Sequence, residues 1–302
     1  TGQPVHQLLG GRVREHLTAY RHAFGWDLPS LLDQVDRRLA EGCTHVRVQS
    51  GVPGLDTVYG VSRETVYEPA GRAARPVEER WDAERYIATV PGVLGAVREH
   101  VGDGIGLLHD AHHRLTPNQA ARLARAVEPV GLYWLEDVTP AEDQEALALV
   151  RSHTTTPLAI GEVFNTVWDC QRIIEERLTD YIRCAVVHAG GISHARKIFA
   201  LAEIHGVGAA PHGPSDISPI GLAASIHLGM ATHNAAIQEY MGHPEPAHEA
   251  FPHAWTFSDG HLDPGDAPGL GVELDEKVLL AHPYDAAHLP VARALDGTLT
   301  DW

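Results

Sequence analysis

The chain has 302 residues, of which 44% are hydrophobic, and its formal net charge is -17 at pH 7. Its length suits one large α/β domain or two smaller ones, and no apolar run in the sequence is long enough to span a membrane. The acidic balance argues against nucleic acid or an anionic membrane as a partner, and an anionic substrate would need local cations. The three cysteines are widely spaced, and the first residues lack the basic region and apolar core of a secretory signal. We therefore expect reduced thiols and a cytoplasmic protein.

The apolar pattern predicts strands that alternate with helices over most of the chain. Because no glycine-rich dinucleotide fingerprint opens a helix, this alternation favours a (β/α) barrel over a doubly wound sheet. The expected strands cover residues 17–20, 44–49, 106–110, 132–137, 157–162, 180–184, 206–212 and 235–240.

Three regions interrupt this alternation. In residues 1–16, Gly10 and Gly11 mark the end of a helix, but almost no helix precedes them. This pattern predicts the end of a linker from a preceding domain. Residues 50–80 show no periodicity, and a loop of this length is typical of a lid or an insertion, with a helix expected from Trp81. Residues 241–302 are rich in proline, glycine, histidine and aspartate, and are expected to pack on the barrel. The barrel domain is therefore predicted over residues 17–240.

Three carboxylates stand at matching places in successive strand-helix units. Asp110, Glu136 and Glu162 are 26 residues apart each time, and each follows an apolar run. Helix starts with the pattern of a capping box are expected at residues 116–119 and 139–142. Because neighbouring parallel strands lie roughly 5 Å apart, these strand ends would bring the three acids together.

A cluster of three carboxylates has a specific electrostatic requirement. The charges repel and raise one another's pKa unless a cation lies among them. An all-oxygen ligand set favours a hard ion, Mg²⁺ before Mn²⁺ or Ca²⁺. The alternative interpretation is that one or more of these acids caps a helix or lies on the surface.

The other strand ends carry cationic and titratable side chains. Arg47 and Arg183 could hold a carboxylate substrate and would supply the positive charge that the net balance lacks. His112 and His212 are candidate acid-base groups, because histidine titrates near neutral pH. His112 would face the same way as the acid two residues earlier if the strand continued that far. Glu239 could fix His212 or contact the substrate.

These motifs resemble those of the enolase superfamily, and within it the D-mannonate dehydratase family, which includes proteins labelled starvation-sensing. The resemblance runs nearly from end to end of the chain. The matching segments are residues 8–11, 47–54, 59–61, 109–114, 134–142, 161–165, 212–219, 238–240 and 289–293, with Trp302.

The resemblance implies a (β/α)₇β barrel and a dehydratase that converts D-mannonate and/or D-gluconate to 2-keto-3-deoxy-D-gluconate. It implies a catalytic base built from Tyr59 with Arg47 beside it, and an acid at His112. The implied Mg²⁺ ligands are Asp110, Glu136 and Glu162. The implied substrate-binding residues are Arg183, His212 and Glu239. The resemblance also implies a symmetric homo-oligomer with a small sugar acid as its ligand, and an N-terminal α+β capping domain to which nothing in these residues corresponds.

Two features separate this chain from its neighbours in the superfamily. Related racemases place a lysine pair on the second strand, where this chain has Arg47 and Gln49, so a lysine-based racemase is disfavoured. Pro214 resembles the group with weak or undetected activity on mannonate or gluconate. The alternatives are therefore a dehydratase or epimerase for another acid sugar, or a weakly active or inactive metabolite-binding or regulatory homologue.

Overall fold

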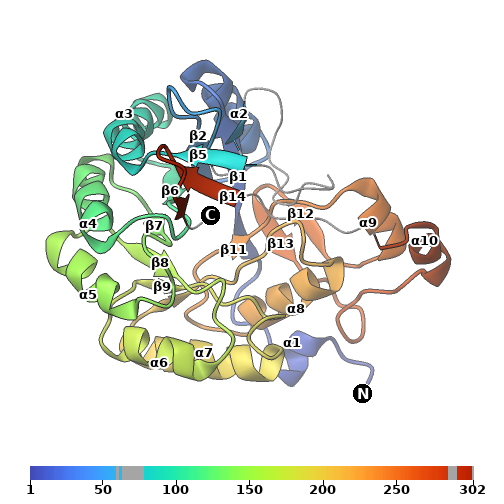
Figure 1. Ribbon diagram of the computed structural model, residues 1–302. Coiled ribbons are helices and arrows are strands. Elements are labelled where there is room, and N and C mark those ends of the chain that lie inside the picture. The colour runs from blue at the N-terminus through green and yellow to red at the C-terminus, as the bar shows by residue number, and fades with distance from the viewer. Residues whose placement is uncertain (59–60, 63–77, 285–290, 301–302) are drawn as a thin grey trace. The chain divides into compact units, whose positions relative to one another are not determined.

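The computed structural model describes residues 1–58, 61–62, 78–284 and 291–300 (Figure 1). The chain divides into two compact units, each assembled from separate segments. Unit 1 comprises Thr1–Arg21, Glu41–Cys43 and Ala159–Pro283, and unit 2 comprises His22–Ala40, Thr44–Leu158 and Tyr284–Trp302. Among the described residues, no helix combines the length and apolarity needed to cross a membrane.

Unit 2 contains three parallel strands in the order in which they occur along the chain. These are β2 (His45–Ser50), β6 (Gly106–Asp110) and β7 (Trp134–Glu136). Its helices are α2 (Leu28–Ala40), α3 (Ala83–Val101), α4 (Pro117–Ala126), η1 (Glu128–Val130) and α5 (Gln144–His153). The register pairs Asp110 with Glu136, so the last residues of β6 and β7 stand side by side. Their position follows from the pairing of the strands and needs no unusual loop.

A second, smaller sheet in unit 2 joins segments that are far apart in the sequence. Its strands are β5 (Glu78–Trp81), β14 (Val291–Ala294) and β15 (Leu299–Thr300), with β14 parallel to β5 and antiparallel to β15. Figure 1 shows β5 and β14 next to each other. The prediction of a helix from Trp81 is wrong by two residues, because Trp81 ends β5. The Asp82 side chain then accepts hydrogen bonds from the first turn of α3.

The long aperiodic region also contains short strands. Within the predicted loop 50–80, β3 (Thr57–Val58) and β4 (Val61–Ser62) pair antiparallel. Two-residue strands are too short to produce an alternating pattern, so they could not be predicted from the apolar periodicity.

Unit 1 contains five parallel strands. The strands are β8 (Leu158–Ile160, of which the last two residues lie in this unit), β9 (Tyr181–Ile182), β10 (Gly208–Ala209), β11 (Gln238–Glu239) and β1 (Leu17–Gly25, as far as Arg21). A parallel bridge between Ala209 and Ala235 links β10 to the segment that enters β11. An antiparallel hairpin of β12 (Thr256–Ser258) and β13 (His261–Asp263) extends β1 on its other side. The helices of this unit are α1 (Val5–Leu8), α6 (Val167–Glu175), α7 (Ile192–His205), α8 (Pro219–Met230), α9 (Glu245–Ala250) and α10 (Glu276–Ala281).

The core of unit 1 forms around α8. Eleven of the twelve residues of this helix are buried, and its sequence contains no Asp, Glu, Lys or Arg. A helix that is apolar all round is stable only when it is covered on every side. The cluster that covers it includes Leu17, Tyr240, Trp255 and Leu262.

The predicted alternation of strand and helix is confirmed in both units. The capping box at the start of α4 is also confirmed: Pro117 begins the helix, and the Gln119 side chain accepts from the Thr116 backbone N–H. The second box is wrong. Asp143 is the N-cap of α5 and accepts from the Ala146 N–H, so the helix begins after residues 139–142 and not within them. The predicted domain limits at residues 16 and 240 stay a prediction.

Candidate functional site

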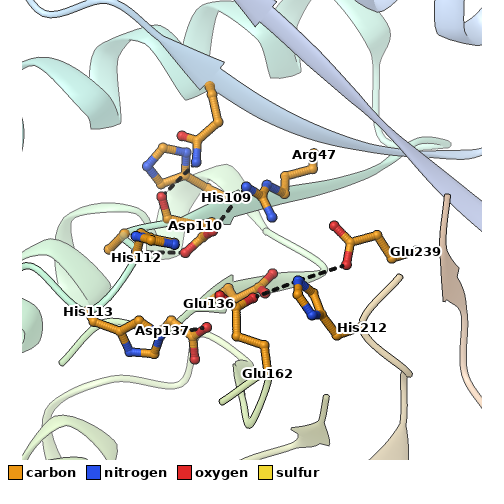
Figure 2. A network of polar contacts seen from close by, with 12 residues as sticks. Arg47, His109, Asp110, His112, His113, Glu136, Asp137, Glu162, His212 and Glu239 are labelled. Atoms are coloured by element: carbon orange, nitrogen blue, oxygen red, sulfur yellow. Dashed lines mark hydrogen bonds and ion pairs between the residues drawn. The ribbon is translucent and has the colours of Figure 1, made fainter. Parts of the chain in front are cut away.

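Two fully buried carboxylates end neighbouring strands of unit 2. Asp110 and Glu136 are both 0% exposed. One oxygen of Asp110 accepts the backbone N–H of His112 at 2.6 Å, and the other lies 3.1 Å from the Arg47 guanidinium. Glu136 accepts the indole N–H of Trp134 at 2.9 Å. Figure 2 shows the Asp110 carboxylate between Arg47 and His112.

A third carboxylate joins this pair. Asp137 is 1% exposed, and one of its oxygens lies within 4.8 Å of an oxygen of Asp110 and of Glu136. Alternation along a strand would point Asp137 away from Glu136. Its φ of 42° ends the extended backbone and brings the carboxylate to the same side. The sequence analysis did not identify Asp137 as a site residue, because nothing in the residue order signals a left-handed turn there.

The donor set of unit 2 fits a hard divalent cation. Three carboxylates are buried together, and Arg47 is in contact with one of them. Buried carboxylates without sufficient positive charge are strongly destabilising, and oxygen ligands are those that Mg²⁺ prefers. Burial alone would raise the pKa of Asp110, but Arg47 and the nearby His112 and His113 bring that pKa below its ordinary value. Asp110 is therefore ionised at neutral pH, as a metal ligand must be.

His112 does not continue the strand. Its φ is 52°, so the expectation that extension would align it with Asp110 is wrong, although a direct backbone hydrogen bond still joins the two residues. The side chain is buried, and burial lowers the pKa of His112 to about 3, against the opposing effect of Asp110. The ring is therefore neutral in this environment at physiological pH.

Behind the acids, a buried hydrogen-bonded group fixes the ends of β2 and β6. His109 contacts the Tyr86 hydroxyl at 2.6 Å through Nε2 and the Val48 carbonyl at 2.7 Å through Nδ1. The Gln49 side chain donates to the Asp110 carbonyl at 2.9 Å. Burial lowers the pKa of His109 to about 4, so a neutral ring with its proton on Nδ1 satisfies both contacts.

Unit 1 contains its own charged group at the ends of β8, β9 and β11. Arg183, 0% exposed, donates to Glu239 at 2.5 Å and to the Tyr20 hydroxyl at 2.7 Å, and lies 3.6 Å from Glu162. His212 Nε2 lies 3.2 Å from Glu162 and 3.7 Å from Glu239 (Figure 2). One histidine and one arginine thus share two buried carboxylates. Tyr20 is a member of this group that the sequence analysis did not identify.

The residue after His212 must be glycine. The Gly213 N–H donates to the Glu239 carboxylate at 3.0 Å. A Cβ at this position would lie 2.6 Å from the Glu239 carbonyl oxygen and 2.7 Å from the Gln238 amide nitrogen. The close backbone approach keeps His212 next to Glu239.

The structure brings the predicted site residues together within each unit. Unit 2 holds four of them: Arg47, Asp110, His112 and Glu136. Unit 1 holds another four: Glu162, Arg183, His212 and Glu239. Tyr59, the expected base, lies outside the described residues. The role that the sequence assigned to each of these residues stays a prediction.

Comparison with known proteins decides the family. Residues 30–278 match the family model described as "Enolase C-terminal domain-like". The chain belongs to the enolase superfamily. The resemblance drawn from the motifs is thereby confirmed.

Individual relatives within the superfamily are named as dehydratases. A "D-galactonate dehydratase family member" of Streptomyces bingchenggensis is 63% identical over 303 residues, which cover 100% of this chain and 74% of that protein. A "D-mannonate dehydratase" of Rhizorhabdus wittichii is 48% identical over 301 residues, covering 100% of this chain and 75% of that protein. This enolase-superfamily chain is accordingly a hydro-lyase of a sugar-acid dehydratase family.

A solved structure supports the fold over the whole chain. An enolase from Pantoea ananatis, crystallised with D-gluconate and Mg bound, matches with a TM-score of 0.90 at 34% identity. The match covers 100% of this chain and 75% of that one. The predicted fold class, the parallel α/β fold of the enolase superfamily, is confirmed.

Proposed function

We propose that the protein catalyses the Mg²⁺-dependent dehydration of a sugar acid, D-mannonate and/or D-gluconate, to 2-keto-3-deoxy-D-gluconate. The observation that carries this proposal is the buried Asp110 and Glu136 pair at adjacent strand ends, with Arg47 in contact with one acid. Other proteins support the proposal in two ways. Relatives of this chain are named as dehydratases, and the Pantoea ananatis protein binds D-gluconate and Mg.

The metal ligands in this proposal are Asp110, Glu136 and Glu162. The equal spacing of the three acids in the sequence supports this set, as does the all-oxygen chemistry of the first two. When bound, Mg²⁺ supplies positive charge beside the substrate carboxylate, where negative charge develops as the proton next to it is removed.

The proton transfers are assigned to Tyr59 and His112. In the arrangement that the resemblance implies, Arg47 would lower the pKa of Tyr59, which would then take the proton beside the substrate carboxylate. His112 would give a proton to the departing 3-hydroxyl group, so that water leaves. Because burial lowers the pKa of His112 to about 3, we expect the ring to gain its proton only when an anionic substrate lies against it.

Substrate binding is assigned to Arg183, His212 and Glu239. The His212 side chain is 14% exposed, whereas those of Arg183 and Glu239 are 0% and 1% exposed. We therefore propose that His212 makes the direct contact with a substrate hydroxyl. The two buried residues would hold the imidazole ring in the orientation that this contact needs.

The test is a screen of purified protein with Mg²⁺ against hexonates and pentonates, with assay of the 2-keto-3-deoxy product. Asp110→Asn removes a proposed ligand, and Glu142→Gln removes an equal charge from an exposed position outside the proposed site. Turnover of mannonate or gluconate in the wild type and in Glu142→Gln, but not in Asp110→Asn, would support the proposal. Turnover of a different acid would keep the mechanism and change the substrate. Absence of turnover in protein that binds Mg²⁺ would contradict the catalytic role and favour a metabolite-binding protein.

A further inference from the structure

We propose that Asp137 is a member of the metal centre, a carboxylate that lies with Asp110 and Glu136 around the cation and is held there by His113. This inference rests on the proposed metal-dependent function, because it concerns the same cation. It adds a residue that strand alternation would place on the opposite face of β7.

The backbone around these residues adopts an unfavourable conformation at three places. His112, His113 and Asp137 have φ values of 52°, 61° and 42°. A non-glycine residue in the left-handed region costs on the order of 1 kcal/mol, and such positions collect where a site requires a particular geometry. Here the consequence of the turn at Asp137 is specific. It directs a carboxylate toward Asp110 and Glu136 that would otherwise face away from them.

His113 holds Asp137 by both its backbone and its side chain. The His113 N–H donates to the Asp137 carbonyl at 2.5 Å, and its Nε2 lies 3.3 Å from the Asp137 carboxylate. On the other side of the ring, Nδ1 lies 3.2 Å from the Thr139 carbonyl. The ring therefore spans the turn after β7 and fixes the direction of the Asp137 side chain (Figure 2).

The charges of this group favour a divalent cation. Asp110, Glu136 and Asp137 are 0%, 0% and 1% exposed, so water contributes little to their solvation. Arg47 supplies one positive charge at 3.1 Å from Asp110. A divalent ion adds two further positive charges to this group, and its field reaches the Asp137 carboxylate.

The experiment measures metal affinity and does not depend on turnover. Mn²⁺ is titrated into the purified protein and followed by the electron paramagnetic resonance of the free ion and by calorimetry. The set compares wild type, Asp137→Asn, His113→Gln and Asp110→Asn, with Glu142→Gln as the control that removes a carboxylate outside the group. Melting curves in EDTA establish that each variant is folded.

We expect Asp137→Asn to weaken Mn²⁺ binding by about tenfold or more, and His113→Gln to weaken it by a smaller factor, because the carboxylate remains but its support is lost. Glu142→Gln should bind as the wild type does. Wild-type affinity in Asp137→Asn, with binding lost in Asp110→Asn, would overturn this inference and leave the proposed metal centre intact. Unchanged affinity in Asp110→Asn as well would overturn both.

Discussion

Replacing Arg183 by methionine tests how much of unit 1 depends on one buried cation. The guanidinium is 0% exposed and contacts Glu239 at 2.5 Å, with Glu162 3.6 Å away. Removing one partner of a buried ion pair costs about 3–5 kcal/mol, because the remaining charge stays buried without compensation. The entropy of unfolding is about 2.1 cal/mol/K per residue, so a chain of 302 residues loses about 5–8 °C of melting temperature.

The assay is differential scanning calorimetry at neutral pH in EDTA, with two comparison variants. Tyr20→Phe removes only the hydroxyl that accepts from Arg183 at 2.7 Å, and we expect a loss of about 1–3 °C. Arg122→Met removes a guanidinium that pairs with Glu84 at the surface, where side-chain exposures are 49% and 60%, and it should cost about 1 °C or less. A melting temperature for Arg183→Met within about 1 °C of the wild type would refute the reasoning from burial.

Three further predictions concern single contacts. Tyr86→Phe removes the hydroxyl that contacts the buried His109 at 2.6 Å, so we expect the free energy of unfolding to fall by about 1–3 kcal/mol. The melting temperature should then be lower by about 2–5 °C, and an unchanged value would contradict the contact. Burial lowers the pKa of His227 to about 4 from 6.5, so the unfolded chain takes up a proton in this range that the folded protein does not. The free energy of unfolding should therefore fall as pH drops from 6.5 to 4, and this residue should account for a loss of roughly 2 kcal/mol at pH 5. Urea unfolding at several pH values should show a smaller loss of that free energy in His227→Gln. Asp143→Ala should destabilise the protein by about 1 kcal/mol and Glu142→Ala by close to none, whereas equal effects would argue against Asp143 as the N-cap of α5.

Residue order alone determined the fold class and selected most of the candidate site residues. Alternating apolar runs and helix starts predict a parallel α/β fold because these patterns arise within single elements. The acids at residues 110, 136 and 162 could be selected for the same reason: each ends an apolar run and recurs at a fixed spacing. The pairing of β6 with β7 then places Asp110 next to Glu136, as the spacing predicted.

Contacts between distant residues, and turns against local preference, were decided only by the tertiary structure. The sequence could not reveal that Arg183 is enclosed by Tyr20 and Glu239, because these residues meet through the pairing of β1 with β11. It could not reveal Asp137 either, because strand alternation is the default expectation and a left-handed turn departs from it. Local patterns identify which residues end strands, but side-chain direction and burial depend on neighbours that only folding brings together.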